Sequence, residues 1–119
     1  LEALAERAEI EVATTLRDGS PGWVPFWVVR VGEGLFARTH REPPATWWRE
    51  ATAAGTTRLR LAPGEPEHAF LVTVVGDMLR PEIDAAYRAR FTGDDAQYVP
   101  GICSESAVAR TVRFRLAPD

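Results

Sequence analysis

Three strand-like segments follow one another near the start of the chain, joined by tight turns rather than by helices. Residues 10–16 alternate between apolar and polar side chains, residues 23–31 are rich in β-branched and aromatic side chains, and residues 35–39 continue the pattern. Residues 18–22 and 32–34 supply the glycine, proline, Asp and Ser that favour turns. Segments joined this closely pair antiparallel, because a parallel connection needs a crossover of a dozen or more residues.

Further along the chain, helical and strand-like patterns follow one another without the regular rhythm of a parallel α/β fold. Pro25 offers no backbone amide to a ladder, which places the second strand at an edge or at a bulge. The remaining apolar spacing predicts strands at 57–61, 68–75 and 111–116, and helices at 1–8, from Thr46 to before Gly55, at 81–91 and at 104–109. We therefore expect an α+β fold in which six antiparallel strands curl into a small barrel with flanking helices.

Length and composition narrow the classes of function. With 119 residues the chain has the size of one domain, so a single domain over residues 1–119 is expected. The formal net charge of −3 argues against nucleic acid as a partner, and no window approaches the roughly 20 apolar residues of a membrane span. All 14 basic residues are arginine, which excludes chemistry at a lysine amine. Cys103 is the single cysteine and has no internal disulfide partner, which favours a reducing, cytoplasmic location.

Three motifs carry a resemblance to a known family. They are residues 27–32 with 35–39, residues 47–49, and residues 83–91 with 109–116. Together they resemble a family of uncharacterised bacterial proteins, DUF2255, that is related to split β-barrel proteins binding flavin or deazaflavin. The resemblance implies a homodimeric split β-barrel of the FMN-binding type, with FMN or F420 in a groove between the barrel and its twin.

One turn departs from the pattern of the deazaflavin-binding relatives. Those proteins usually carry a lysine or arginine in the turn that grips the phosphate of the cofactor, whereas residues 18–23 contain no cation here and begin with Asp18. The possible substitutes are Arg38, Arg41 and Arg49, because a planar guanidinium holds a phosphate or carboxylate through two hydrogen bonds.

The sequence Arg38-Thr39-His40-Arg41 is the first candidate binding segment. It leaves a strand and precedes a helix, which brings two cations, a hydroxyl and an imidazole into a loop of the kind that often binds polar ligands. The alternative is a solvated loop whose arginines pair with Glu33 or Glu42. If Arg38 binds a ligand, its replacement by alanine is expected to weaken anion binding and leave folding intact.

Tryptophans are the candidates for contact with a flat ring. Trp47 and Trp48 are adjacent, so on a helix they point about a hundred degrees apart and only one faces the core. The other packs under the barrel rim, or lies against a cofactor ring or a dimer partner. Trp23 and Trp27 share one face of a regular strand and are predicted to line a substrate pocket with one of that pair.

Other reactive side chains favour a structural interpretation. Asp84 is expected to pair with Arg88 on the outer side of its helix, Tyr87 to belong to the apolar stripe, and Cys103 to be an inert thiol. No histidine or cysteine pair has metal-ligand spacing, so no metal site is predicted, and no catalytic residue is identified.

Three functional hypotheses follow. The first is a small dimeric split-barrel protein that binds FMN or F420 and acts as an oxidoreductase on a small molecule, with hydride transfer supplied by the cofactor. The absence of any cofactor is equally compatible with the residues. The second hypothesis is therefore a cofactor-free barrel whose tryptophan-rich pocket binds or converts an apolar metabolite, and the third is a structural dimeric interaction module.

Overall fold

The computed structural model describes residues 2–118. Leu1, which the sequence places in the first helix, lies outside the described residues, as does residue 119. The helices are α1 (Glu2–Glu6), α2 (Thr46–Ala54), α3 (Arg80–Arg90), α4 (Val99–Ile102) and α5 (Glu105–Ala109), with a 3-10 helix η1 (Gly93–Tyr98) before α4. The strands are β1 (Glu9–Thr15), β2 (Pro21–Trp27), β3 (Val29–Val31), β4 (Gly34–Ala37), β5 (Thr56–Arg60), β6 (His68–Val74) and β7 (Val112–Leu116).

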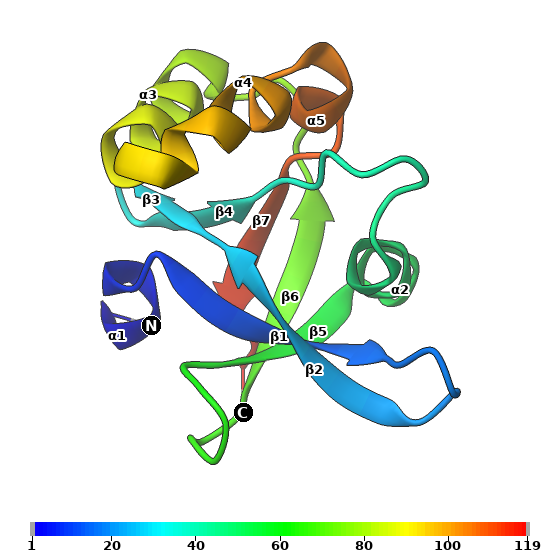
Figure 1. Ribbon diagram of the computed structural model, residues 1–119. Coiled ribbons are helices and arrows are strands. Elements are labelled where there is room, and N and C mark those ends of the chain that lie inside the picture. The colour runs from blue at the N-terminus through cyan, green and yellow to red at the C-terminus, as the bar shows by residue number, and fades with distance from the viewer. Residues whose placement is uncertain (1, 119) are drawn as a thin grey trace.

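The strands form one antiparallel sheet in the order β2-β1-β5-β6-β7-β4-β3. Its two edge strands, β2 and β3, are consecutive in the chain and are separated by Val28 alone. The sheet therefore curls until its edges meet along one stretch of chain, as the crossing of β2 over β1 shows in Figure 1. The expected antiparallel sheet with flanking helices is confirmed.

The predicted number of six strands is wrong, because the long segment at residues 23–31 is divided at Val28 into β2 and β3. The Val28 N–H donates to the Ala8 carbonyl, 3.1 Å away, instead of continuing a strand ladder. The first half of the segment pairs with β1 and the second half with β4, so this one segment borders two different neighbours. Seven strands result.

Two apolar clusters lie on opposite faces of the sheet. The cluster inside the curl contains Val12, Leu59 and Phe70 and is closed at one end by Trp47 of α2. The second lies between the β3–β4 face and the layer formed by α3, η1 and α4, which lies above those strands in Figure 1. Its members are Val29, Phe36, Ile83, Tyr87, Phe91, Val99 and Ile102.

Some element boundaries differ from the prediction. The first helix ends at Glu6 rather than near Ala8, and the helical turns of residues 93–102 were not predicted. The return strand ends at Ala37 rather than at Thr39. This shorter β4 matters for function, because it releases residues 38–45 from the sheet to form a connection to α2.

Candidate functional site

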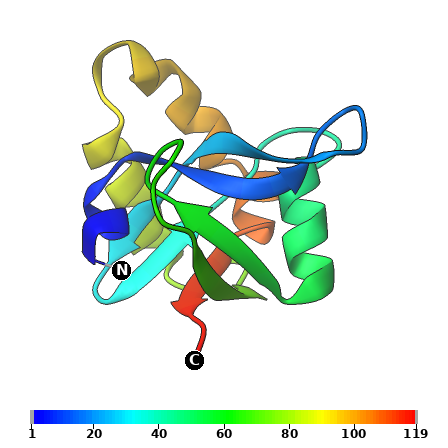
Figure 2. The ribbon, with the colours of Figure 1, turned by 90° about the horizontal axis from the view of Figure 1, so that it is seen from below.

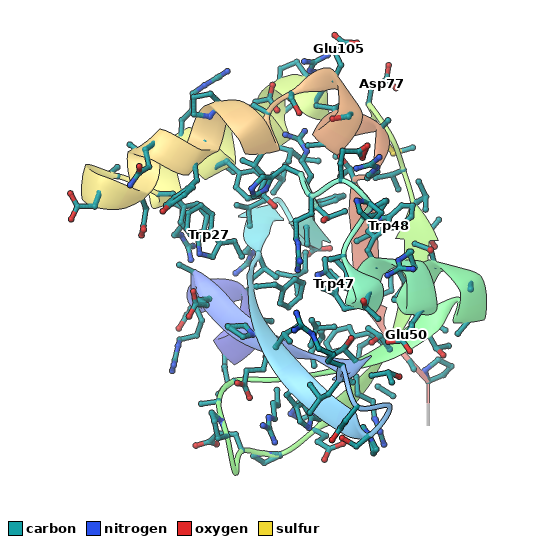
Figure 3. All side chains as sticks on the ribbon, turned by 45° about the vertical axis from the view of Figure 1, so that its right-hand side comes forward. Trp27, Trp47, Trp48, Glu50, Asp77 and Glu105 are labelled. Carbon is teal, nitrogen blue, oxygen red and sulfur yellow. The ribbon has the colours of Figure 1, made fainter. Side chains whose placement is uncertain are left out.

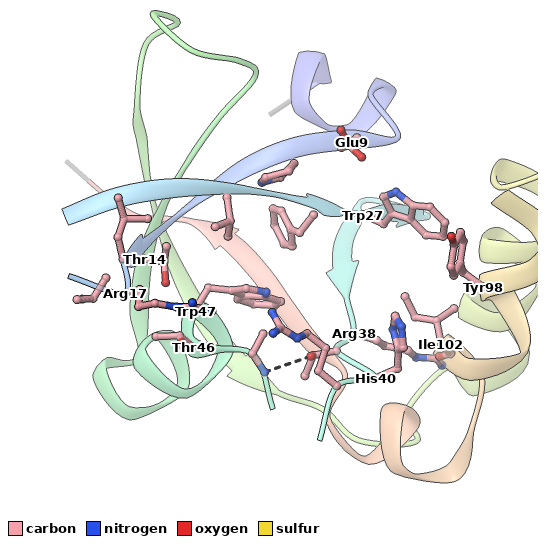
Figure 4. A pocket seen from close by; sticks show the side chains of 18 residues that line it. Glu9, Thr14, Arg17, Trp27, Arg38, His40, Thr46, Trp47, Tyr98 and Ile102 are labelled. Carbon is pink, nitrogen blue, oxygen red and sulfur yellow. Dashed lines mark hydrogen bonds between the residues drawn. The ribbon is translucent and has the colours of Figure 1, made fainter. Parts of the chain in front are cut away.

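A cleft of about 640 Å³ opens beside the free edge of β2. The edge of β2 forms one wall, and the connection after β4 together with the start of α2 forms the other. Figure 4 shows Trp27 and Tyr98 at one end, and Arg17, Thr14 and Trp47 at the opposite end. The cleft can open here because β4 ends at Ala37. If β4 were longer, the residues that now form the second wall would pair within the sheet instead.

The aromatic end of the cleft is held rigidly by the helical layer. The Trp27 indole stacks on Phe91, with ring centroids 3.8 Å apart and planes 11° apart. Tyr98 meets the same indole edge-on at a centroid distance of 6.0 Å and is 50% exposed. One face of Trp27 is therefore occupied by Phe91, and the half-buried remainder offers a fixed aromatic surface to a ligand.

Two exposed arginines and an exposed imidazole line the rest of the cleft. The side chains of Arg17, His40 and Arg41 form no hydrogen bond or ion pair with the residues that the structure describes. Glu9, at the Trp27 end in Figure 4, is the single acidic residue in the described lining. A positive cleft in a chain of net charge −3 favours an anionic ligand over a cationic one.

Arg38 lines the cleft, but its guanidinium lies below the surface. Its side chain is 0% exposed and forms an ion pair with Asp84 at 2.5 Å. Nε donates to the Thr111 hydroxyl at 2.9 Å and Nη1 to the Ile102 carbonyl at 3.2 Å, while Nη2 has no acceptor among the described residues. The expectation that Arg38 serves ligand binding alone, and is dispensable for folding, is therefore incompatible with its position.

Asp84 is likewise part of the framework. It is buried and pairs with Arg38 and, at 3.5 Å, with Arg80, so the predicted outer pair with Arg88 is wrong. Burial opposes ionisation of Asp84, but the hydrogen bond and charge of Arg38 outweigh it and hold its pKa below the usual range. The Tyr87 hydroxyl accepts the Arg38 backbone N–H at 3.1 Å, and burial raises the pKa of that phenol.

Cys103 lies beside this network. Burial and the nearby charge of Asp84 raise the pKa of its thiol, so the reactive thiolate is disfavoured. The interpretation of Cys103 as an inert thiol agrees with this environment.

Six of the nine predicted binding residues line the cleft: Trp27, Arg38, Thr39, His40, Arg41 and Trp47. Thr39 is buried, and its hydroxyl oxygen accepts the Ala45 N–H at 3.4 Å, which fixes the approach of the connection to α2. Trp47 packs inward against Phe26, with ring centroids 4.9 Å apart. Thus His40, Arg41 and Trp27 are the predicted residues with side chains open to a ligand.

The other three predicted residues lie outside this cleft. Trp48 points away from Trp47 in Figure 3 and donates its indole N–H to the Arg110 carbonyl at 2.8 Å. Arg49 donates to the Pro44 carbonyl and to the Thr46 hydroxyl, each at 3.1 Å. Trp23 lies 4.2 Å below the Arg60 guanidinium in a cation–π contact. Each of these side chains has a structural partner of its own.

Among the cleft residues that sequence reasoning missed, Arg17 and Tyr98 matter most for ligand binding. Arg17 lies one residue before the turn at 18–23, where the deazaflavin-binding relatives carry a phosphate-binding cation. Its position next to that turn is a sequence signal for its role. Tyr98 ends a 3-10 helix whose sequence has no helical apolar spacing, so no local pattern indicated it. The predicted alternative, in which the loop arginines pair with Glu33 or Glu42, is not observed among the described residues, because Arg38 pairs with Asp84 and Glu42 pairs with Arg110.

A carboxylate fastens the hairpin that carries Arg17. Glu50 on α2 accepts hydrogen bonds from the Thr15 N–H at 2.9 Å and from the hydroxyls of Thr15 and Thr14 at 2.5 and 3.2 Å. These bonds, the Thr15 hydroxyl first, lower the pKa of Glu50. The end of β1 is thereby tied to α2 across the cleft wall.

We expect acid to loosen this hairpin. Because the pKa of Glu50 is lower in the folded protein than in the unfolded chain, its contribution to stability is present above the ordinary glutamate range and is lost as the pH falls. The Glu50→Gln variant should show faster amide hydrogen exchange at Thr15 at neutral pH and a smaller loss of protection on acidification. Glu65→Gln, in the exposed turn before β6, is the control, and equal exchange in both variants would contradict the fastening role.

The fold and the cleft define a split-barrel-like protein with a ligand-sized opening where the barrel splits. The chain matches, over residues 1–114, the family described as an uncharacterized protein conserved in bacteria, DUF2255. It therefore belongs to that family. A comparison with curated protein sequences found no match.

Solved structures share the fold at low sequence identity. HutZ, the haem storage protein of Vibrio cholerae, is 18% identical with a TM-score of 0.64, covering 96% of this chain and 83% of its own. A conserved hypothetical protein of Mycobacterium tuberculosis is 13% identical with a TM-score of 0.61, covering 98% and 76%. An F420 reductase is 21% identical with a TM-score of 0.51, covering 99% and 92%. The expected split-barrel likeness is thus confirmed.

Proposed function

We propose that the cleft binds a flavin or deazaflavin, FMN or F420, and that the protein acts as an oxidoreductase on a small molecule. The observation that carries the proposal is the joint presence, in one cleft, of a fixed aromatic surface and of two arginines whose side chains have no partner among the described residues. Trp27 with Tyr98 would face the ring, and Arg17 with Arg41 would face the anionic tail. The bound cofactor supplies the hydride chemistry.

The dimensions and lining of the cleft fit such a ligand. About 640 Å³ lies within the usual size of a small-molecule site. The walls are largely apolar, with Val24, Phe26 and Ile102 excluding water from one side of a bound ring. Exposed guanidinium groups at the other side suit phosphate or carboxylate, each of which accepts two hydrogen bonds from one arginine.

Similar structures support a ligand-binding role. One is named a haem storage protein and another an F420 reductase, and both names refer to large planar groups. His40 adds an exposed imidazole to this cleft, a group that also binds iron, so haemin belongs among the ligands to be tested.

A cofactor-free pocket for an apolar metabolite is the second candidate function. Pro25 and Phe26 of β2 continue the apolar wall toward Trp47, and Asp18 makes the neighbouring turn acidic. This candidate predicts that none of the three planar groups remains bound.

The visible absorption spectrum decides between these functions. The purified protein is mixed separately with FMN, F420 and haemin, desalted, and measured. We expect near-stoichiometric retention of FMN or F420, and a loss of retention in Trp27→Ala because the ring then loses its aromatic surface. Trp23→Ala is the matched control, since Trp23 is also half-buried and lies outside the cleft. Retention of haemin alone, or of no chromophore, would overturn the flavin proposal.

The homodimer implied by the family resemblance and the cytoplasmic location stay predictions. Within the described residues, no helix has the length and apolar character needed to span a membrane.

Sedimentation equilibrium of the purified chain measures the assembly. A homodimer should give twice the 13.1 kDa chain mass.

A further inference from the structure

A second pocket lies on another part of the barrel and shares no lining residue with the cleft. It has a volume of about 360 Å³ and lies where β7 runs past the beginning of β4, near α1. Figure 2 shows the end of β7 emerging on this underside. The pairing of β7 with β4 ends at Phe114 and Leu35, so Arg115 and Leu116 of β7 extend beyond the start of β4.

Three arginines line this pocket: Arg30 on β3, and Arg113 and Arg115 on β7. Glu33 is the one acidic residue in the described lining. Acidic residues outnumber basic ones in the chain by 17 to 14. Three arginines around one pocket are therefore a local excess of positive charge. Arg113 and Arg115 leave the same face of β7, so their like charges repel one another, and an anion placed beside them would relieve that repulsion.

Two of the three arginines are held in position before any ligand arrives. The Arg113 guanidinium lies 5.9 Å from the centroid of Phe36, and its Nε is buried without an acceptor among the described residues. Arg30 is oriented by its Nε–H, which donates to the Gly32 carbonyl at 2.9 Å. Arg115 is exposed, and its side chain has no hydrogen bond or ion pair with any residue described.

Glycine at position 34 leaves room for the ring of Phe36. A Cβ at Gly34 would lie 2.5 Å from the ring of Phe36, so a side chain there would displace the ring over which Arg113 lies. Because Gly34 has no side chain, its backbone lines the pocket beside the arginines. The volume suits a compact anion rather than a polymer.

We propose that this pocket binds a small phosphate-bearing anion with two or more negative charges, such as a diphosphate group. Arginine guanidinium groups match phosphate oxygens in pairs, and several of them in one pocket suit an anion of high charge. The site is independent of the cleft and of the redox function proposed for it. A phosphorylated metabolite bound here would touch β7, β4 and the β3–β4 turn.

Titration with inorganic pyrophosphate tests the site. Amide and arginine Nε–H signals are followed by NMR at constant ionic strength in the full chain. We expect saturable shifts at Gly34 and Arg115, and a loss of affinity of roughly tenfold in Arg115→Ala, which removes one charge-assisted contact. Arg115 is exposed on its strand, so the variant retains the packing of Phe114 and Val112 in the core.

Arg58→Ala is the matched control, because Arg58 is an exposed arginine on β5 outside both pockets. Its affinity for pyrophosphate should change by less than about twofold, as for a distant surface charge. Two results would overturn the proposal. One is a shift that sodium chloride reproduces at matched ionic strength, and the other is an equal loss of affinity in both variants.

Discussion

Replacing Asp84 by alanine is expected to lower the free energy of unfolding by about 3–5 kcal/mol, because it leaves the Arg38 charge buried without its partner. The Arg38 side chain is 0% exposed and that of Asp84 only 11% exposed, so water is a poor replacement for the lost carboxylate. Arg80 is also a cation and offers no compensation. Arg38→Ala should be destabilising by a similar mechanism, since Asp84 would then retain only its longer contact with Arg80.

Urea unfolding monitored by tryptophan fluorescence measures this effect. Arg58→Ala is the control for an exposed ion pair, because Arg58 is 61% exposed and its contact with Glu67 is worth at most about 1 kcal/mol. The double variant Arg38→Met/Asp84→Leu removes both charges and should recover most of the stability of the parent protein. Equal stability of Asp84→Ala and Arg58→Ala would show that the Arg38–Asp84 pair does not hold the barrel to α3.

The burial of Arg38 explains why its role was not predictable from the sequence. Its neighbours along the chain indicate a loop after a strand, where arginines are ordinarily solvated. The groups that bury it, Asp84 and Ile102, are 46 and 64 residues away. Local patterns contain no information about such long-range partners, whereas the apolar spacing that predicts a strand at residues 111–116 is local, and the structure has β7 there.

The two strand tryptophans show the same distinction. Even spacing correctly indicated that Trp23 and Trp27 point to one side of β2, away from Phe26 in the core. Trp23 meets Arg60 of β5, whereas Trp27 reaches Phe91 of the helical layer. The strand period predicts the side on which a residue lies, and tertiary packing decides what lies opposite. Only one of the pair therefore belongs to the cleft.

Of the three arginines that the sequence suggests for an anionic group, Arg38, Arg41 and Arg49, only Arg41 has a side chain open to the cleft, and Arg17 joins it there in the proposed site. Arg38 is fully buried, and Arg49 is bound to Pro44 and Thr46 outside the cleft. The two exposed arginines come from separate segments, Arg17 from the turn after β1 and Arg41 from the connection to α2. An anionic tail bound between Arg17 and Arg41 would bridge the two sides of the cleft. Glu50 of α2 connects the same two sides through its hydrogen bonds with Thr14 and Thr15 of β1.

The double variant Arg17→Ala/Arg41→Ala is expected to lower the affinity for FMN by roughly 100-fold, about tenfold for each charge-assisted contact removed. Affinity for riboflavin, which has the same ring and no phosphate, should stay within about twofold, because the Trp27 and Tyr98 surface is unchanged. Quenching of flavin fluorescence measures both ligands. Arg49→Ala is the control, and its affinity for FMN should equal that of the parent protein. A parallel loss for FMN and riboflavin would show that the variant damages the cleft, whereas binding of both ligands with no effect of the variant would place the phosphate away from these arginines.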